Sequence, residues 1–228
     1  MSICLTFDVE RDWYEVVGLS IKKPYKEKTF DMIRRSIPRL LEISEEYNLH
    51  FTFFICKDVA ENCSDLFIGL KNHMIGVHTH PFVHEHIFKG RTPNDYDKDR
   101  LSLYSFEEQY EMISADKESI RINLGIDPVA FRAGKHSFNF QTIRILEHLG
   151  FGIDCSFHPG YQLIGWKPFK ISNKIWEVPT YCGYAPEITS LVKLLFHFSR
   201  LICKLCTFKD SIYSIVIHPM VFGNPMIN

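Results

Sequence analysis

Apolar and polar positions alternate along this chain in a pattern that predicts strands and helices in turn. Short apolar runs rich in β-branched and aromatic residues predict strands, and longer stretches with an apolar stripe predict helices. The predicted strands cover residues 3–7, 50–55, 73–80, 129–132, 152–156, 176–179 and 211–217. The predicted helices cover residues 36–47, 58–71, 105–125, 139–149 and 188–206.

Local signals predict where two of these helices begin and where one of them ends. Ser36 followed by Pro38 predicts a helix N-terminus, because serine caps a first turn and proline is tolerated within it. Ser105 with Glu108 forms a capping-box pattern, and Gly125 suits the left-handed residue that follows a helix.

Repeated strand–helix units of this length predict a parallel sheet covered by helices, which is an α/β fold. With about seven strands, a closed or nearly closed barrel is favoured over an open sheet. The polar stretch 87–103 predicts a long loop. No repeat or linker-like stretch interrupts the pattern, so residues 1–228 are predicted to form a single domain.

Composition narrows the classes of partner. Hydrophobic residues make up 46% and the net charge is -1, so the chain has no excess of basic residues and no nucleic-acid partner is expected.

The odd count of 7 cysteines and the absence of a signal-peptide pattern predict reduced thiols and a cytoplasmic location. The apolar stretch 188–206 fits burial against the barrel, which we favour, or contact with a membrane or lipid carrier.

Ionisable side chains stand where the predicted strands end. The carboxyl ends of parallel barrel strands meet at one face, and catalytic groups gather there. Convergence of acids, imidazoles and a guanidinium from separate strands therefore predicts an active site. These residues are Asp8, Glu10, Asp12, His78, His80, His84, His86, Arg132, Asp154, Glu177 and His218.

The histidine spacing predicts a metal site. His78 and His80 lie two apart on an extended segment, so both imidazoles face one side, with Cα atoms about 6.5 Å apart. His80 with His84, four apart, is the alternative pair. With a carboxylate from the first strand, two imidazoles and an open position are typical of a catalytic Zn²⁺ or related divalent site.

Hydrolysis at such a site needs a base and an acid. Asp8 is a candidate base, and Arg132 would keep it ionised by pairing with it. His218 is a candidate acid, because an imidazole supplies a proton near neutral pH. Asp154 would hold that imidazole in its charged form.

Five motifs in sequence order resemble those of the polysaccharide deacetylases, the NodB-homology or carbohydrate esterase family 4 group. The stretch 52–54 also resembles this family. The five motifs are residues 6–10 (Thr-Phe-Asp-Val-Glu), 75–81 (Ile-Gly-Val-His-Thr-His-Pro), 131–134 (Phe-Arg-Ala-Gly), 153–160 (Ile-Asp-Cys-Ser-Phe-His-Pro-Gly) and 217–219 (Ile-His-Pro).

The resemblance implies a distorted (β/α) barrel of about seven strands, a divalent metal, often zinc, and removal of an acetyl group from an N-acetylated sugar. It implies that Asp8 is the base and that Glu10, or alternatively Asp12, is the metal-binding acid. The same resemblance matches Arg132 to the arginine that supports the base, His218 to the acid and Asp154 to its carboxylate partner.

Two positions depart from the commonest family motifs. Val9 follows Asp8 where a second aspartate is usual, and Phe82 stands four residues after His78 where a histidine is usual. We favour His78 with His80 as ligands, because a His-x-His followed by proline occurs in variants of the family. The expected function is de-N-acetylation of a lipid-linked or nucleotide-linked sugar in intracellular surface-glycan synthesis. The alternatives are hydrolysis of a small non-sugar amide and a degenerate barrel that binds a glycan.

Overall fold

The computed structural model describes residues 2–17, 20–90, 95, 97–158, 167–182 and 212–217. These residues build a nine-stranded sheet whose neighbouring strands are all parallel except β8 and β9. In spatial order the strands are β10 (Thr180–Cys182), β11 (Ile212–Ile217), β1 (Ser2–Val9), β4 (Phe51–Ile55), β5 (Met74–Thr79), β6 (Ala130–Ala133), β7 (Ile153–Asp154), β9 (Trp176–Glu177) and β8 (Phe169–Lys170).

One bent segment of chain closes this sheet into a distorted barrel. β9 pairs with β7 at one end of the sheet, and β10, just beyond it in the chain, pairs with β11 at the other end. The bend includes Pro179, which has no N–H to donate to a ladder. Val178 and Thr180 still donate, to the carbonyls of Asp154 and Phe157 at 2.8 and 2.9 Å. With β9 and β10 counted as one bent strand, the described sheet has the seven parallel strands that the sequence predicts.

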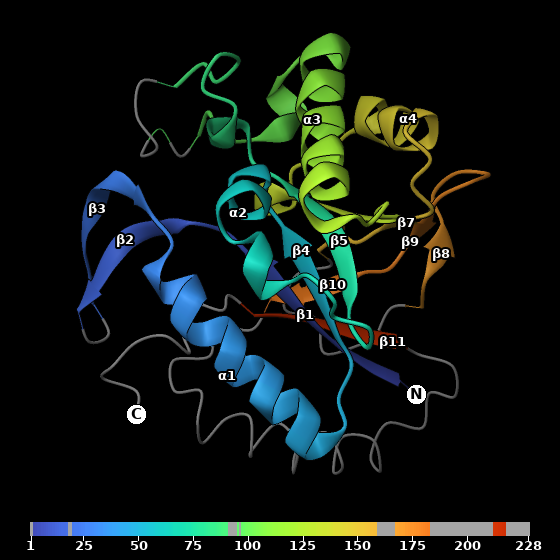
Figure 1. The fold of residues 1–228 in the computed structure, drawn as a ribbon. Coiled ribbons are helices and arrows are strands. Elements are labelled where there is room, and N and C mark those ends of the chain that lie inside the picture. Colours follow the sequence, from blue (N-terminus) through green and yellow to red (C-terminus); the bar gives the residue numbers. More distant parts are fainter. Residues whose placement is uncertain are drawn as a thin grey trace.

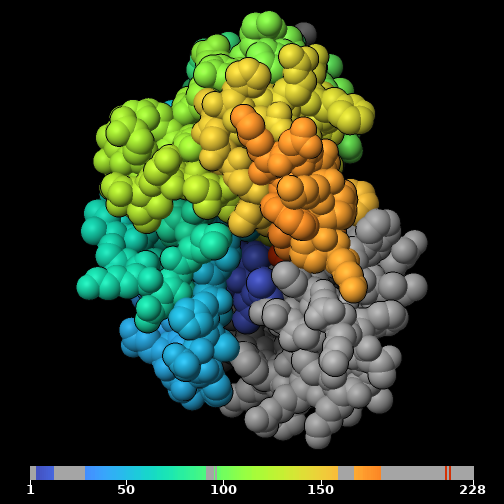
Figure 2. Space-filling model, turned by 90° about the vertical axis from the view of Figure 1, so that its right-hand side faces the viewer, coloured from blue at the N-terminus to red at the C-terminus, as the bar shows by residue number. Residues whose placement is uncertain are grey.

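The helices of the described residues lie on the outside of this barrel. Figure 1 shows α1 along one side of the sheet, with α3 and α4 grouped away from it. Figure 2 shows the segment of β8 and β9 directly beside α4. The helices are α1 (Asp31–Tyr47), α2 (Lys57–Asn62), α3 (Phe106–Leu124) and α4 (Phe140–His148), and short 3₁₀ turns cover Ser64–Leu66, Pro81–Val83, Leu101–Leu103 and Gly134–His136.

Helix α1 begins at Asp31, five residues before the predicted start, so the prediction that Ser36 caps it was wrong. The Ser36 hydroxyl instead donates to the carbonyl of Met32 at 2.7 Å, and Pro38 lies inside the helix. The first turn receives a partner from far along the chain, because the Met32 N–H donates to the Asp12 carboxylate at 3.3 Å. A contact across 20 residues leaves no local sequence signal.

The predicted start and end of α3 are confirmed. Ser105 and Glu108 form the capping box, and Gly125 ends the helix with a φ of 68°. The predicted helix 58–71 is shorter, because α2 ends at Asn62.

An antiparallel hairpin was not predicted; it consists of β2 (Asp12–Val17) and β3 (Ser20–Thr29). The predicted helix 188–206 lies outside the described residues. Among the helices that are described, none has the length and hydropathy of a membrane span.

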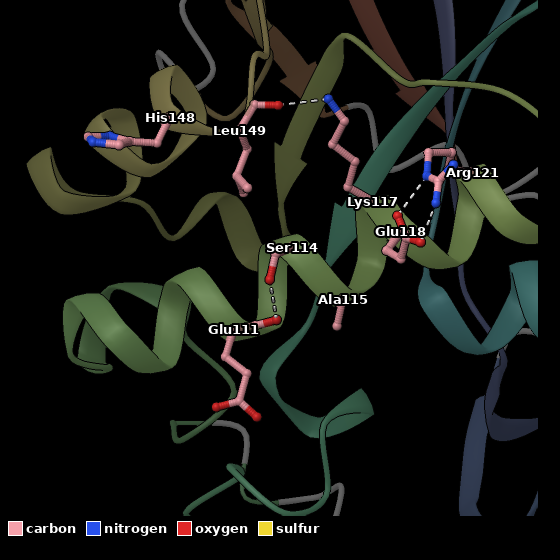
Figure 3. A pocket seen from close by; sticks show the side chains of 8 residues that line it. All are labelled: Glu111, Ser114, Ala115, Lys117, Glu118, Arg121, His148 and Leu149. Atoms are coloured by element: carbon pink, nitrogen blue, oxygen red, sulfur yellow. Dashed lines mark hydrogen bonds and ion pairs between the residues drawn. The ribbon is translucent and has the colours of Figure 1, made fainter.

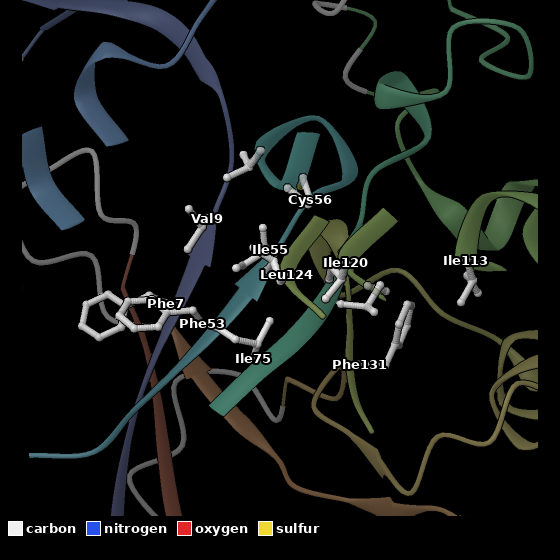
Figure 4. Close-up of a cluster of buried hydrophobic side chains, with 14 of the residues drawn as sticks. Phe7, Val9, Phe53, Ile55, Cys56, Ile75, Ile113, Ile120, Leu124 and Phe131 are labelled. Carbon is white, nitrogen blue, oxygen red and sulfur yellow. The ribbon is translucent and has the colours of Figure 1, made fainter. Parts of the chain in front are cut away.

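Successive residues of the barrel strands point to opposite faces, and the two faces are filled differently. The outward face packs under the helices as a large apolar cluster that includes Phe7, Phe53 and Phe131 (Figure 4). The rings of Phe7 and Phe53 stack with centroids 5.4 Å apart. The inward face holds a small apolar cluster around Phe54 and several buried polar side chains. The apolar face therefore supplies most of the packing energy, and the inward face is left for chemistry.

Phe53 offers a test of that packing. Phe53→Ala removes a fully buried ring and should lower the free energy of unfolding by about 3–5 kcal/mol. Phe140→Ala is the matched control, because Phe140 is 89% exposed and its loss should change stability by less than about 0.5 kcal/mol. Urea unfolding of both variants measures the difference, and equal losses would contradict the assignment of the core.

Candidate metal centre and active site

The inward face of two barrel strands carries paired ionisable side chains. Asp8 and Glu10 lie two apart where β1 ends, and His78 and His80 lie two apart where β5 ends. Because side chains in extended chain alternate, the members of each pair face the same side. All four side chains are buried. The backbone of β1 and β5 thus directs two acids and two imidazoles toward one region.

Glu10, His78 and His80 form a compact cluster there. Oε1 of Glu10 lies 3.0 Å from Nε2 of His78 and 3.3 Å from Nε2 of His80. One candidate ligand atom from each of the three residues lies within 4.8 Å of the others. These distances suit three ligands around one divalent ion.

The hydrogen bonds on the far sides of the rings determine which nitrogens face the cluster. Nδ1 of His78 lies 3.0 Å from the carbonyl oxygen of Arg132, which can only accept, so Nδ1 carries the proton. Nδ1 of His80 likewise lies 2.7 Å from the Asp99 carboxylate. In the neutral rings both Nε2 lone pairs then point at the Glu10 carboxylate. Two imidazole nitrogens and a carboxylate oxygen that face one another form a donor set that fits a metal ion.

The electrostatics of His80 agree with that reading. Burial disfavours the charged imidazole, but the neighbouring carboxylates of Asp99 and Glu10 raise its pKa well above the ordinary value. The surroundings of this ring therefore favour positive charge.

Asp8 lies beside the cluster and is held by Arg132. Nη1 of Arg132 donates to Oδ1 of Asp8 at 2.6 Å, and the other oxygen of Asp8 lies 3.8 Å from Nε2 of His78. The guanidinium is fully buried, donates to Thr6 at 2.9 Å and lies 4.1 Å from the ring centre of Phe54. The structure thus contains the predicted Asp8–Arg132 pair, which leaves one Asp8 oxygen on the side of the Glu10–His78–His80 cluster.

The two alternative ligands lie elsewhere. Asp12 accepts from the Thr29 hydroxyl at 2.9 Å and from the first turn of α1, so its carboxylate is used to join the hairpin to the helix. Nε2 of His84 lies 2.9 Å from Asp116, whose other oxygen accepts from Thr79 at 2.5 Å. The only cluster of candidate ligands among the described residues is Glu10, His78 and His80. The structure therefore places neither alternative at the candidate centre.

Asp154 is buried on β7, but its predicted partner His218 lies outside the described residues, so that pairing stays a prediction. Oδ1 of Asp154 accepts from the Ser156 hydroxyl at 2.5 Å. Glu177 lies opposite Asp154 in the β7–β9 register and is equally buried. Burial raises the pKa of Asp154 to about 6, and burial together with the Asp154 charge raises the pKa of Glu177 to about 10. Glu177 consequently keeps its proton near neutral pH.

Sequence reasoning missed three residues near the centre. Asp99 lies in the stretch predicted only as a polar loop, and Lys135 and His136 follow β6 with positive φ values of 54° and 51°. Burial lowers the pKa of His136 to about 4, so its ring is neutral, and Nδ1 lies 3.1 Å from the carbonyl oxygen of Ser156. Positive φ outside glycine is uncommon and often marks a functional site. No periodic pattern in the sequence could have revealed the left-handed backbone at Lys135 and His136.

A separate surface hollow lies between α3 and α4 (Figure 3). Lys117 donates to the carbonyl of Leu149 across it at 2.8 Å, and Glu118 and Arg121 form an ion pair on its wall. Its lining contains none of the predicted site residues. The hollow is therefore distinct from the candidate centre.

Fold and site together define a parallel α/β barrel with a candidate divalent-metal centre at the carboxyl ends of its strands. The model of the polysaccharide deacetylase family matches residues 20–153, more than half of the chain, and the chain belongs to this family. The matched residues include His78, His80 and Arg132 but not Asp8 or Glu10, whose placement comes from the geometry described above. No curated protein matches the sequence significantly.

Solved structures show the same fold at low sequence identity. A putative polysaccharide deacetylase from Mycobacterium smegmatis is 18% identical, with 86% of this chain and 68% of that chain covered and a TM-score of 0.59. The Puue allantoinase is 13% identical, with 99% and 80% covered and a TM-score of 0.66. A family pseudoenzyme from Bacillus anthracis is 14% identical, with 96% and 54% covered and a TM-score of 0.54. Likeness to proteins of such different activity shows the fold alone.

The buried Asp154–Glu177 pair predicts how stability depends on pH. The folded protein keeps the Glu177 proton up to about pH 10, whereas an unfolded glutamate loses it near about pH 4.3. Above about pH 6 Asp154 is ionised in the folded protein too, and unfolding releases only the Glu177 proton, so the free energy of unfolding should fall as pH rises, by at most about 1.4 kcal/mol per pH unit. Glu177→Gln should flatten that decline, and unfolding curves from pH 7 to 9 measure it.

The control for this experiment is Glu42→Gln on the exposed face of α1, which should leave the wild-type pH dependence unchanged. A Glu177→Gln variant with the same slope as wild type would show that Glu177 is ionised in the folded protein.

Proposed function

We propose that this protein is a metal-dependent hydrolase that removes the acetyl group from an N-acetylated sugar. The observation that carries the proposal is the buried Glu10–His78–His80 cluster beside the Asp8–Arg132 pair. Membership of the polysaccharide deacetylase family supports the reaction class. Zinc is the metal that we propose, because one carboxylate, two imidazoles and an open position are typical of catalytic zinc sites.

The chemistry that a divalent ion supplies when bound there is to acidify a water molecule and to polarise the amide carbonyl. Asp8 is the proposed base that takes the proton of the attacking water. Arg132 holds Asp8 ionised and fixes one of its oxygens at 2.6 Å, which leaves the other oxygen on the side of His78. Burial strengthens this electrostatic arrangement, since little solvent screens it.

The leaving amine needs a proton, and we propose His218 as its donor with Asp154 as the carboxylate that supports the imidazolium. The sequence places His218 directly after β11, which lies next to β1 in the sheet, and this adjacency supports the assignment. The cytoplasmic location and the lipid-linked or nucleotide-linked sugar substrate stay predictions from the sequence.

Two other functions define the alternative outcomes. One is hydrolysis of a small non-sugar amide, and the fold is shared with an allantoinase. The other is a barrel that binds a glycan without catalysis, and the fold is also shared with a pseudoenzyme. Acetate release from N-acetylated sugars, amine release from small amides and metal content separate the three.

One divalent ion should bind per chain through Glu10, His78 and His80. His78→Ala should abolish stoichiometric metal binding, because it removes one of three ligands, while circular dichroism shows that the fold is retained. His80→Ala should lose the metal as well. His84→Ala is the matched control and should keep it, since His84 pairs with Asp116 instead. Elemental analysis after zinc loading measures the content, and equal losses in His80→Ala and His84→Ala would move the ligand to His84.

Asp8→Asn should keep the metal but lower the rate of acetate release by roughly 10²–10⁴-fold, the usual contribution of a general base. The amide oxygen can still accept from Arg132, but the buried guanidinium loses its counter-charge, so circular dichroism has to show that the variant is folded before the rates are compared. The exposed Asp97→Asn control should keep full activity. A zinc-loaded wild-type protein that releases no acetate from any N-acetylated sugar would overturn the proposed function.

A further inference from the structure

Asp99 is a buried carboxylate that contacts the candidate centre from a loop far from its ligands in the sequence. Its side chain makes three polar contacts with other residues that the structure describes. Oδ2 lies 2.7 Å from Nδ1 of His80 and 3.2 Å from Nζ of Lys135, and Oδ1 accepts from the N–H of Phe82 at 3.2 Å. It is only 3% exposed, so few of these contacts are shared with water. Burying a carboxylate is costly unless hydrogen bonds or opposite charges compensate it, and here the imidazole of His80 and the ammonium of Lys135 do so.

We propose that Asp99 is a positioning residue that holds His80 in its metal-binding orientation. The inference rests on the proposed function, because it assumes the metal centre at Glu10, His78 and His80. Asp99 accepts from Nδ1, so the remaining proton-free nitrogen, Nε2, is the one that faces Glu10. A carboxylate on the far side of a ligating imidazole also makes the ring a stronger donor to the metal.

His80 needs such a partner more than His78 does. His78 lies within β5, where it pairs in register with Arg132 and contacts the carbonyl oxygen of that residue. The β5–β6 register ends one residue later, at Thr79 opposite Ala133. His80 therefore lies just beyond the ladder, and although its extended backbone points the ring to the same face as His78, no β5–β6 pairing restrains it. Asp99 supplies from a loop the constraint that the sheet supplies for His78.

The face of the His80 ring is restrained as well as its edge. A Cβ atom at Gly134 would lie 2.5 Å from ring atoms of His80, so only glycine allows the ring to pack this close to the backbone after β6. The next residue, Lys135, has a left-handed φ of 54° and places its ammonium beside Asp99. The backbone at Gly134 and the carboxylate of Asp99 thus hold the ring from two directions.

Lys135 also offsets the charge that Asp99 brings. Without a nearby cation, Asp99 and Glu10 would place two buried carboxylates on one imidazole. The Lys135 side chain is 15% exposed, and its ammonium contacts Asp99 at 3.2 Å and connects the Asp99 loop to the end of β6. The orientation of His80 therefore depends on two segments that the chain brings together only in the folded barrel.

The test compares metal affinity in Asp99→Ala, Asp99→Asn and the exposed Asp97→Ala control from the same loop. Zinc affinity is measured by competition with a chelator, and Co²⁺ absorption reports the coordination geometry. Asp99→Ala should weaken zinc binding by roughly 10–100-fold and alter the Co²⁺ spectrum. Asp99→Asn should lose less, because its amide oxygen still accepts from Nδ1. Asp97→Ala should match wild type in both measurements.

The outcomes separate this inference from the proposed function. A wild-type protein that binds no metal overturns both. A wild type that binds zinc, with a folded Asp99→Ala variant that binds it equally tightly and gives the same Co²⁺ spectrum, overturns the role of Asp99 alone. If Asp99→Ala fails to fold, Asp99→Leu decides, because it keeps much of the volume but cannot accept from Nδ1, and wild-type affinity with an unchanged spectrum in that variant contradicts a positioning role.

Discussion

The guanidinium of Arg132 lies fully buried inside the barrel, and the strands around it supply its partners. It donates to Asp8 and Thr6 of β1, to the carbonyl of Cys155 just after β7, and to Thr180 of β10. A buried cation without a counter-charge would cost several kcal/mol, so Asp8 is needed for stability as well as for chemistry. The same contacts tie the bent closing segment of the sheet to the strand that carries the proposed base.

Inside the barrel, several buried carboxylates lie close to the place where a divalent cation is expected. Arg132 compensates Asp8, Lys135 compensates Asp99, and the Glu10 carboxylate lies against the imidazoles of His78 and His80. The divalent ion that we propose would add positive charge beside these three side chains. Away from the cluster, buried negative charge is avoided in a different way. Glu177 keeps a proton, so no second negative charge is buried beside Asp154.

Some predictions from the sequence succeeded because they depended on local geometry. The pairs Asp8 with Glu10 and His78 with His80 share a face because extended chain has a period of two. The capping box at Ser105 formed because its partners lie three residues apart. The start of α1 failed for the converse reason. Its partner Asp12 belongs to a hairpin that the sequence pattern does not predict, whereas Ser36 has only the local signal of a cap.

The sequence by itself determined the alternation of strands and helices, the seven parallel strands and the faces on which the candidate ligands lie. Only the tertiary structure decided between the alternatives. Asp12 is held by Thr29 and α1, and His84 by Asp116, which leaves Glu10, His78 and His80 as the cluster. The physical reason is that backbone geometry sets the direction of a side chain locally. Which groups it meets, as His80 meets Asp99, depends on how distant segments pack.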